Sequence, residues 1–521
     1  MKSKLEYMSH KTSQGIFVGF LSLFVFIVVT VGVNFFTQGA VLEYLAKFDK
    51  NSVAIDTNLK SFSVGMAAPV TSLDPLNFEF QNRLILNNSY EGLVALDSSL
   101  QVKQALAVTF GQVDETTWEF RIREGVKFHN GSELSANDVI QSFRSAMEDS
   151  SSQLKSILAN IDDITAGGGK IQIKTKKPDP TFINKLATVY IYKDFDNGER
   201  YGTGPYVLSQ EKKPSNTFDG SRVLLERFDD YWGREPSVSE ATFVYVQNKD
   251  ERMKLFKDGK IDVLRNVPYN LLESIKKMDA VIMEQPSLEV TFLGFGFKST
   301  EVFKDPSVVN MIIKSINRDE LINAFGSAVH TANQFVSNGV VGYVPGLTSE
   351  DIEEEIPANF TLPENTDLTL DFANGQNEIA KRIQSNMKKL GFNITLNQVG
   401  GEEFINMLHS GKSDMYLLGW KSEFGDAIDF YKVMAHSREG HLGEFNAGNY
   451  SNPEVDELIA ESDNTWNPLE RVKILQKIMK IILIDNPLGM PILETEIIYA
   501  VKKGINFVPR IDGYIYLNEL R

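Results

Sequence analysis

The residues best suited to bind a ligand directly follow a short apolar segment late in the chain. Met415–Trp420 (MYLLGW) is predicted to be a strand of a parallel layer, and Lys421–Asp429 comes immediately after it. Such layers bind ligands beyond the carboxyl ends of their strands. The candidate acids of this loop are Asp426 and Asp429, and a carboxylate held in a cleft forms a strong charge-assisted bond to an ammonium group. The loop is therefore the first candidate for a binding site.

The sequence lacks the residues that most other kinds of functional site require. The chain has no cysteine, which excludes disulfides, thiolate nucleophiles, Cys-ligated zinc, iron–sulfur clusters and a lipidated N-terminal cysteine. There are six histidines, and His436 and His441 are five apart with no obvious third ligand, so no metal site is predicted. Gly167–Lys170 (GGGK) lacks the spacing and the Ser/Thr of a phosphate-binding loop. No Gly-x-Ser-x-Gly nucleophile turn occurs, and no cofactor is expected.

The elements that would position the loop alternate between strand and helix from about residue 300. Strand patterns occur at Leu368–Ala373, Phe392–Val399 and Met415–Trp420. Helical patterns occur between them, at Glu378–Leu390 and Glu402–Ser410. A glycine follows each of these helices. Strand and helix alternating through short joints are typical of a right-handed parallel α/β layer.

The earlier half of the chain has a mixed α+β pattern. Trp118–Phe128 alternates apolar and charged residues, which predicts a half-buried strand, and Asn130–Gly131 is a turn signal. Ser135 stands three residues before Asp138, a capping arrangement that opens a helix. Further strands are predicted at Lys170–Thr175, Arg222–Phe228, Thr242–Val246 and Ile261–Leu264, with a helix at Asp250–Asp258.

Length and charge narrow the class of protein. The 521 residues suffice for two or three domains. The 69 acidic and 53 basic side chains give a net charge of −16, which argues against nucleic-acid binding because that needs a concentrated basic face. No internal repeat stands out, so we expect two unlike lobes with a ligand between them.

The N-terminal region contains an apolar run of membrane length. Ile16–Phe36 has no charged residue, and 21 residues of helix span about 31 Å, the thickness of a bilayer core. Lys2, Lys4 and Lys11 precede it, which favours a cytoplasmic N-terminus. The alternative is a cleaved signal, but such signals have about 7–15 apolar residues and small residues at the cleavage site. The run is longer, so we predict a retained single-pass anchor with the body on the extracytoplasmic side.

Several segments in a fixed order carry a resemblance to a known family. Trp118–Phe143 (WEFRIREGVKFHNGSELSANDVIQSF) has the family's Trp, strand and Gly-x-Lys-Phe-His pattern, with Asn130 where Asp is usual. It is followed by Gly202–Tyr206 (GTGPY), Arg227–Gly233 (RFDDYWG), Arg252–Pro268 (RMKLFKDGKIDVLRNVP), Ile316–Phe325 (INRDELINAF) and Gly411–Trp420. Over about residues 62–515 the chain resembles the family 5 extracellular solute-binding proteins, the peptide- and nickel-type receptors of ABC importers.

The resemblance implies an α/β fold with a mixed α+β first lobe and an α/β second lobe. These would form the two-lobed clamshell of periplasmic binding proteins, with an extra subdomain, after one transmembrane helix. Hinge closure would enclose the ligand, so no catalytic residue is expected. The crossing strands would fall near Leu288–Phe297 and Pro487–Leu493. The expected boundaries are 1–14 for the cytoplasmic N-terminus, 15–37 for the anchor, 38–60 for a spacer, 61–297 for lobe I with an inserted subdomain at about 91–200, 298–487 for lobe II and 488–521 for the return to lobe I.

The resemblance also implies site residues. In peptide-binding members an Asp shortly after the Gly-Trp pair faces the ligand's α-ammonium group, which assigns that contact to Asp426, with Asp429 as the alternative. The expected ligand-lining residues are Gly419, Trp420, Phe424, Thr71 and Ser72. The competing interpretations are solvated loop acids, core packing of Trp420, and a surface turn at Ala68–Pro75.

One departure from the family bears on the ligand. Dipeptide receptors place an Arg ahead of the second-lobe helix to clamp a carboxylate, and the matching Asp371–Asn377 (DFANGQN) has no basic residue. We therefore expect peptides longer than dipeptides, bound by a monomeric receptor and delivered to an ABC permease and its ATPase subunits. The alternatives are an oligosaccharide or metal chelate in the same fold, or a membrane-anchored sensor or scaffold without transport.

Overall fold

The computed structural model describes residues 60–194, 199–209, 222–268, 271–323, 329–352, 366–465 and 467–520. Residues Thr57–Arg521 form one compact unit. The predicted anchor at 15–37 lies outside the described residues. Within the described ranges, no helix is both long and apolar enough to cross a membrane.

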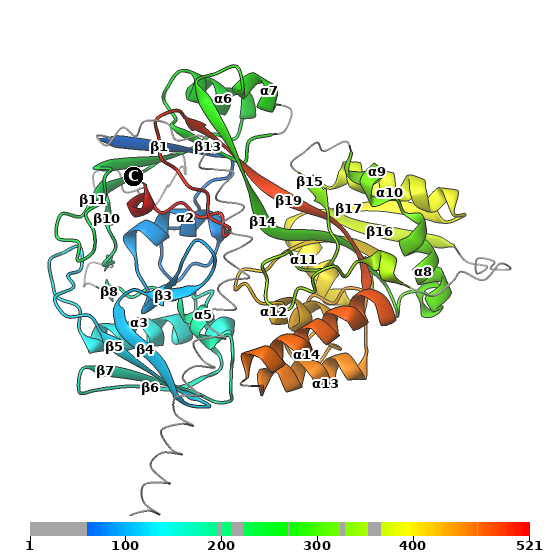
Figure 1. Ribbon diagram of the computed structural model, residues 1–521, viewed down its shortest axis with the longest axis horizontal. Coiled ribbons are helices and arrows are strands. Elements are labelled where there is room, and N and C mark those ends of the chain that lie inside the picture. The colour runs from blue at the N-terminus through cyan, green and yellow to red at the C-terminus, as the bar shows by residue number, and fades with distance from the viewer. Residues whose placement is uncertain are drawn as a thin grey trace, which may run out of the picture. The chain divides into compact units, whose positions relative to one another are not determined.

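A long mixed sheet runs through the whole fold (Figure 1). In the described part of the chain it has eleven strands, ten of them in the order β10-β11-β12-β1-β13-β19-β14-β18-β16-β17, while β15 pairs with β19. Their bounds are β1 Ser61–Met66, β10 Tyr206–Leu208, β11 Arg222–Arg227, β12 Glu240–Tyr245, β13 Val263–Arg265, β14 Ala280–Phe295, β15 Val329–Thr331, β16 Asp367–Ala373, β17 Asn393–Val399, β18 Met415–Lys421 and β19 Gly489–Lys502.

We call the two ends of this sheet, with their helices, lobe I and lobe II. In lobe I, β1 pairs in parallel with β12 and β13, and the helices are α2 Phe80–Ser89, α6 Lys249–Lys257 and α7 Leu272–Ile275. In lobe II, β16 pairs in parallel with β17 and β18, which confirms the predicted parallel layer. The helices of lobe II are α8 Pro306–Ser315, α9 Arg318–Ile322, α10 Asn377–Lys389, α11 Gly401–Ser410, α12 Ile428–Phe430, α13 Pro453–Asp463 and α14 Pro468–Lys480.

An inserted subdomain follows α2 in lobe I. Its main sheet is antiparallel, in the order β4-β5-β7-β6. Its elements are β2 Val94–Leu96, β3 Val102–Gln104, β4 Ala107–Asp114, β5 Thr117–Ile122, α3 Ala136–Glu148, α4 Lys155–Leu158, β6 Ile161–Gly167, β7 Lys170–Thr175, α5 Phe182–Leu186, β8 Lys193–Asp194 and β9 Arg200–Tyr201. Ser135 and Asp138 form the predicted capping box of α3. The strand predicted as far as Phe128 ends at Ile122, and Gly125 then turns the chain with φ +72°.

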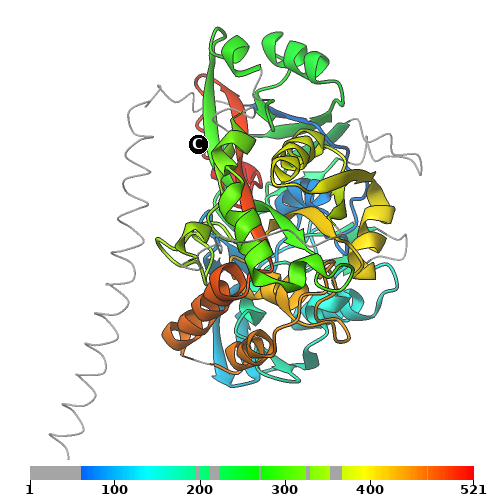
Figure 2. The ribbon, with the colours of Figure 1, turned by 90° about the vertical axis from the view of Figure 1, so that its right-hand side faces the viewer.

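Two long strands connect the lobes. β14 and β19 run antiparallel side by side, green and red in both views (Figures 1 and 2), from the pair Ala280–Lys502 in lobe I to the pair Gly294–Gly489 in lobe II. Their register shifts between Pro286 and Val290. Leu288, inside this irregularity, has φ +58°, a left-handed conformation that is uncommon for a branched side chain. The irregularity lies between the two lobes, where we expect the hinge of a clamshell.

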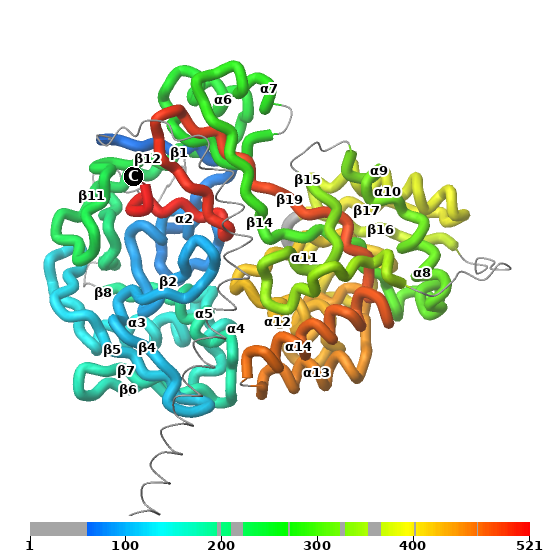
Figure 3. Tube along the Cα trace, viewed as in Figure 1, coloured from blue at the N-terminus to red at the C-terminus, as the bar shows by residue number. Residues whose placement is uncertain are grey.

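After β19 the chain returns to lobe I and lies beside α2, as the red and blue segments show in Figure 3. The side chain of Asn88 on α2 donates to the carbonyl of Ile515 at 2.9 Å and accepts from the amide of Leu517 at 2.8 Å. Residues more than 400 positions apart thus build one wall of lobe I.

Two of the family-like motifs of lobe I meet at one half-buried carboxylate. Glu91 accepts hydrogen bonds from Thr203 Oγ1 at 2.9 Å, Tyr231 Oη at 2.9 Å and Trp232 Nε1 at 2.8 Å. Burial raises the pKa of Glu91 to about 7 although these donors lower it. A Cβ on Gly202 would come 2.1 Å from the carbonyl oxygen of Ser89, so only glycine fits there. The GTGPY and YWG motifs therefore shape lobe I.

Candidate ligand-binding site

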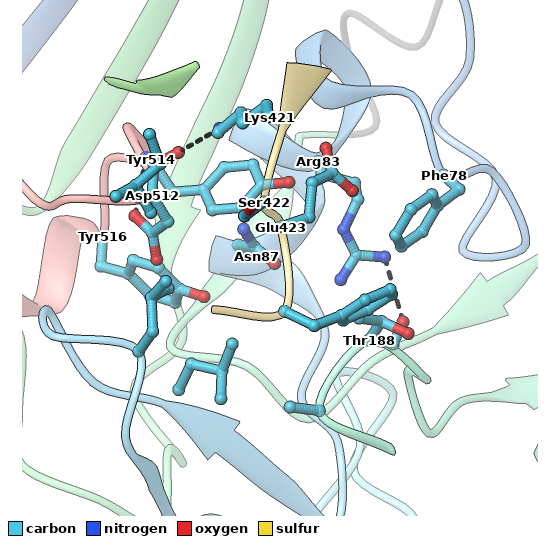
Figure 4. Close-up of a pocket in the computed structure, with 15 residues that line it drawn as sticks. Phe78, Arg83, Asn87, Thr188, Lys421, Ser422, Glu423, Asp512, Tyr514 and Tyr516 are labelled. Carbon is cyan, nitrogen blue, oxygen red and sulfur yellow. Dashed lines mark hydrogen bonds between the residues drawn. The ribbon is translucent and has the colours of Figure 1, made fainter. Parts of the chain in front are cut away.

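A cavity lies where α2, the segment after β18 and the C-terminal return meet (Figure 4). It has a volume of about 40 Å³, enough for a few water molecules and too small for a peptide. A larger occupant therefore requires the lobes to move apart. The residues that line the cavity are Phe78, Arg83, Asn87, Leu96, Leu100, Ala187, Thr188, Leu288, Lys421, Ser422, Glu423, Phe424, Asp512, Tyr514 and Tyr516.

Lobe II contributes four consecutive residues to the cavity, the last residue of strand β18 and the three that follow it. Strand β18 is held in register by β14, with Trp420 opposite Val290 and Lys421 opposite Glu289. Its end delivers Lys421–Phe424 to the cavity, which is the position expected beyond the carboxyl end of a parallel strand. Phe424 is the one residue of the sequence-predicted set that the structure brings to this cavity.

Glu423 is the free acid of the cavity. It forms no ion pair with another residue in the described ranges, and burial raises the pKa of its carboxyl although the charges of Lys421 and Arg83 lower it. A partly desolvated carboxylate that forms no direct ion pair gains from an approaching cation. Sequence analysis did not single out Glu423.

Lys421 is buried by aromatic rings. Its ammonium lies 4.6 Å from the ring centre of Phe80 and 5.9 Å from that of Tyr514, and it donates to the carbonyl of Asp512 at 2.8 Å. Burial lowers the pKa of Lys421, while the charges of Glu423 and Asp512 raise it. This hydrogen bond joins lobe II to the C-terminal return of lobe I.

A second hydrogen bond crosses between the lobes. Asn184 Nδ2 on α5 donates to the carbonyl of Phe424 at 3.2 Å. Leu100 lies on the same border, because a Cβ placed on Gly425 would be 3.2 Å from its Cδ1. The segment after β18 therefore contacts two parts of lobe I, helix α5 through Asn184 and the loop that contains Leu100.

Helix α2 supplies the lobe I side of the cavity. Although its sequence (FQNRLILNNS) is half polar, residues Asn82–Ser89 are all buried. Arg83 is 4% exposed; its guanidinium lies 4.4 Å from the ring centre of Tyr190, and Nη1 donates to the carbonyl of Thr188 at 3.0 Å. Asn87, one turn later, accepts from Tyr190 Oη at 2.6 Å. Both side chains therefore have donors left over.

The aromatic wall is fixed by a buried ion pair. Arg510 is 1% exposed and binds Asp512 through Nε and Nη2, the latter at 2.7 Å. Its Nη2 also donates to the carbonyls of Leu96 and Asp97. The guanidinium lies 4.3 Å from the ring centre of Tyr516, so the pair positions the tyrosines of the return segment.

Asp426 has a different partner from the expected ammonium group. Its Oδ2 lies 2.6 Å from Arg471 Nη1 and its Oδ1 lies 3.0 Å from Arg471 Nη2, and Oδ1 also accepts from the amide of Ile428. Asp426 does not line the cavity described above. Burial and the charge of Asp426 raise the pKa of Asp429 well above its ordinary value. The carboxylate of Asp429 accepts from the amide of Phe430 at 2.7 Å.

The remaining predicted residues also lie outside the lining of this cavity. The ring of Trp420 packs edge-on against Phe430, and its buried Nε1 has no hydrogen-bond partner. Gly419 pairs with Thr291 of β14.

The loop that precedes α2 has its polar groups occupied by that helix. Thr71 and Ser72 donate their amides to the side-chain oxygen of Asn82, at 2.8 and 3.2 Å. The hydroxyl of Thr71 also donates to Glu79. These contacts hold the loop against α2.

Some of the residues that sequence analysis missed lie in a segment that carries a signal. Arg83 and Asn87 belong to a short segment that mixes polar residues with Leu and Ile, and such a segment is buried only when its polar groups are used. The tyrosines of the return segment gave no comparable signal, because their place depends on contacts with segments far away in the chain.

Two lobes joined by two long strands, with a charged and aromatic cavity where they meet, define the class of two-lobed solute-binding proteins. The chain belongs to the bacterial extracellular solute-binding proteins, family 5, whose profile matches residues 101–441. Members of this family are substrate-binding receptors of ABC transporters and not enzymes.

Individual relatives cover nearly the whole chain. The nickel-binding protein NikA of Staphylococcus aureus is 25% identical over 491 residues, which cover 89% of this chain and 94% of NikA. The glutathione-binding protein GsiB of Escherichia coli is 24% identical over 483 residues, 86% of this chain and 91% of GsiB.

Solved structures share the fold at lower identity. CtaP of Listeria monocytogenes aligns with a TM-score of 0.76 at 19% identity, covering 89% of this chain and 99% of CtaP. DppA of Helicobacter pylori, solved with the peptide STSA, aligns with a TM-score of 0.70 at 19% identity, covering 88% and 98%.

Proposed function

We propose that this chain is an extracytoplasmic receptor that captures peptides between its lobes and delivers them to an ABC permease. The observation that carries the proposal is Glu423, an acid of the inter-lobe cavity that forms no ion pair with another described residue. The peptide's α-ammonium group would bind this carboxylate, because a charge-assisted hydrogen bond stabilises a carboxylate that burial has partly removed from water. The aromatic rings of Phe424, Tyr514 and Tyr516 would pack against the peptide.

In this proposal Glu423 takes the role that the family resemblance assigned to Asp426. Asp426 holds Arg471 and thereby fixes the loop from which Glu423 extends. The length preference for peptides beyond dipeptides stays a prediction, based on the absence of a basic residue in Asp371–Asn377. There Asp371 is 7% exposed and accepts from Asn397 Nδ2 at 2.6 Å.

The test is thermal unfolding of the full-length protein, purified in mild detergent, with pools of two- to eight-residue peptides. A bound ligand at 100 times its dissociation constant adds about 2.7 kcal/mol of stability. We expect a rise in melting temperature with free peptides and little rise with the same pools N-acetylated, because acetylation removes the ammonium charge.

Glu423→Gln should abolish the difference between free and acetylated pools. The matched control is Glu454→Gln, an exposed acid of α13 paired with Lys477, which should behave like the wild type. A Glu423→Gln protein that still prefers free N-termini would contradict the assignment. Stabilisation by oligosaccharides or metal chelates, with none by peptides, would contradict peptide binding and support the alternative ligands.

We further propose that residues 16–36 anchor the receptor in the cytoplasmic membrane with its body outside the cytoplasm, in place of a lipid on cysteine. Intact mass of the protein from membranes should include the N-terminus, and protease added to spheroplasts should digest the body. A mature mass that begins after residue 36 would show a cleaved signal instead.

A further inference from the structure

Helix α2 presents two buried polar side chains to the cavity, and within the described residues their hydrogen-bond donors are only partly used. Arg83 and Asn87 are four residues apart, so they extend from the same face of the helix. Arg83 is 4% exposed and Asn87 is 7% exposed, and both line the cavity. Burial of polar groups on this scale normally requires partners.

The donors of Arg83 are only partly used. Nη1 binds the carbonyl of Thr188, while the flat faces of the guanidinium are covered by Phe78 and Tyr190, at 5.1 and 4.4 Å from the ring centres. No acid in the described ranges forms an ion pair with Arg83. Within the described ranges its guanidinium has the hydrogen bond to Thr188 and meets Glu423 through charge alone, so its other N–H groups can bind an anion in the cavity.

The amide of Asn87 is oriented by a neighbour. Its Oδ1 accepts from Tyr190 Oη at 2.6 Å, which leaves Nδ2 as the free end, and Nδ2 is buried without a hydrogen-bond partner. The same tyrosine stacks on Arg83, so Tyr190 aligns both donors. Across the cavity, the hydroxyl of Ser422 is also buried and unpartnered.

We propose that Arg83 and Asn87 form a carboxylate subsite, so that the solute of this receptor bears a carboxylate bound to lobe I. Two converging donors match the two oxygens of a carboxylate, and guanidinium–carboxylate pairs are strong where water is excluded. Glu423 faces the same cavity from lobe II with the opposite charge. A solute with an ammonium group and a carboxylate would therefore connect the lobes, and the inference rests in this respect on the proposed function.

The carboxylate has two possible sources, the C-terminus of a short peptide or an acidic side chain of a longer one. The test measures binding of three sets of probes to the full-length protein by calorimetry. They are alanine peptides of two to six residues as free acids, the same peptides as C-terminal amides, and amidated peptides with one internal Glu.

We expect wild-type protein to bind either the free acids or the Glu-containing amides at least tenfold more tightly than the plain amides. Arg83→Gln should reduce this preference to less than threefold, and Asn87→Asp, which places a negative charge at the subsite, should reverse it. The matched control is Arg123→Gln, because Arg123 lies over the ring of Trp232 at 4.0 Å and does not line the cavity. It should keep the wild-type preference.

The outcomes separate the subsite from peptide binding. Equal affinity of wild type for acids and amides, or a preference that survives in Arg83→Gln, would overturn the subsite and leave peptide binding intact. If no peptide binds, the probe becomes sodium acetate against sodium chloride at equal ionic strength. Acetate should then raise the melting temperature of wild type and not of Arg83→Gln, and a failure to do so would overturn the subsite as well.

Discussion

Glu423 and Asp426 stand three positions apart in one loop, yet their surroundings differ. Asp426 has a guanidinium on both oxygens, whereas Glu423 lines the cavity and forms no ion pair with another described residue. An acid that is already paired stabilises the protein, and an acid that lacks a partner is available to a ligand. The distinction is invisible in the sequence, because it depends on Arg471, 45 residues later.

Asp426→Asn should destabilise the protein by about 3–5 kcal/mol, because it leaves the buried charge of Arg471 without a partner. The two side chains are only 10% and 7% exposed. Urea unfolding measures the change. The exposed pair Glu454–Lys477, with both side chains 55% exposed, is the comparison, and Glu454→Gln there should cost at most about 1 kcal/mol. Equal effects would mean that the buried pair is not structural.

Peptide affinity should depend on pH through Glu423. Burial raises the pKa of this acid in the unliganded protein, and a bound ammonium group would lower it again, so binding releases a proton. Affinity should rise with pH through the raised pKa of Glu423 and fall above about pH 8, where a peptide's amine loses its proton. Calorimetry from pH 4 to 9 measures both limbs. In Glu423→Gln, peptide affinity should no longer rise with pH on the acidic side, whereas the fall above about pH 8 should remain.

At the level of helices and strands, the spacing of apolar residues and the positions of glycines predicted many of the elements of lobe II. The helix predicted at Glu378–Leu390 is observed at Asn377–Lys389, and the strand at Met415–Trp420 ends one residue later. Gly391 and Gly411 follow their helices with φ +97° and +63°, conformations that favour glycine. Local rules succeed here because each helix covers its own neighbouring strand.

The candidate site could not be predicted in the same way. Its walls come from α2, the segment after β18 and the C-terminal return, and only the second of these follows a rule about parallel sheets. Helix α2 has a weak apolar pattern because it is surrounded on all sides, so periodicity gives no signal. Tyr514 and Tyr516 are placed by the Arg510–Asp512 pair, which is a matter of tertiary contacts.

The GTGPY turn offers a test of close packing between elements. Gly202→Ala should cost about 1–3 kcal/mol, because the new Cβ would lie 2.1 Å from the carbonyl oxygen of Ser89 at the end of α2. Gly111→Ala in β4 is the matched control, since nothing lies within 4 Å of its Cβ position. Its change should stay within about 0.5 kcal/mol. Denaturant midpoints of the two variants measure the difference, and similar midpoints would contradict the tight approach.

For the whole molecule, the small cavity and the two hydrogen bonds across it describe lobes that are closed on each other. The bonds are Asn184–Phe424 and Lys421–Asp512, and neither involves an ion pair. Neutral or singly charged hydrogen bonds of this kind contribute about 1 kcal/mol each. Opening at the β14–β19 irregularity would break these two hydrogen bonds and separate Leu96 and Leu100 from the apolar cluster of lobe II.

The absence of native cysteine permits a direct test of opening. Cysteines placed at Asn184 and Phe424, joined by a short bis-maleimide, should hold the lobes closed. Cross-linking before peptide is added should prevent binding, whereas cross-linking afterwards should trap the peptide. Each single-cysteine variant treated in the same way is the control. Unchanged binding after cross-linking would contradict entry through opening of the lobes.

The position of β19 also has a consequence for biosynthesis. This strand lies between β13 and β14 in the middle of the sheet, and the segment that follows it supplies the tyrosine wall, yet both are made after the other strands of the sheet. During vectorial synthesis or export, lobe II can fold as soon as it emerges, whereas lobe I waits with an unfilled central gap. A ribosome that stops before β19 would thus release a chain that has no binding site and an open sheet edge, a natural target for quality-control proteases.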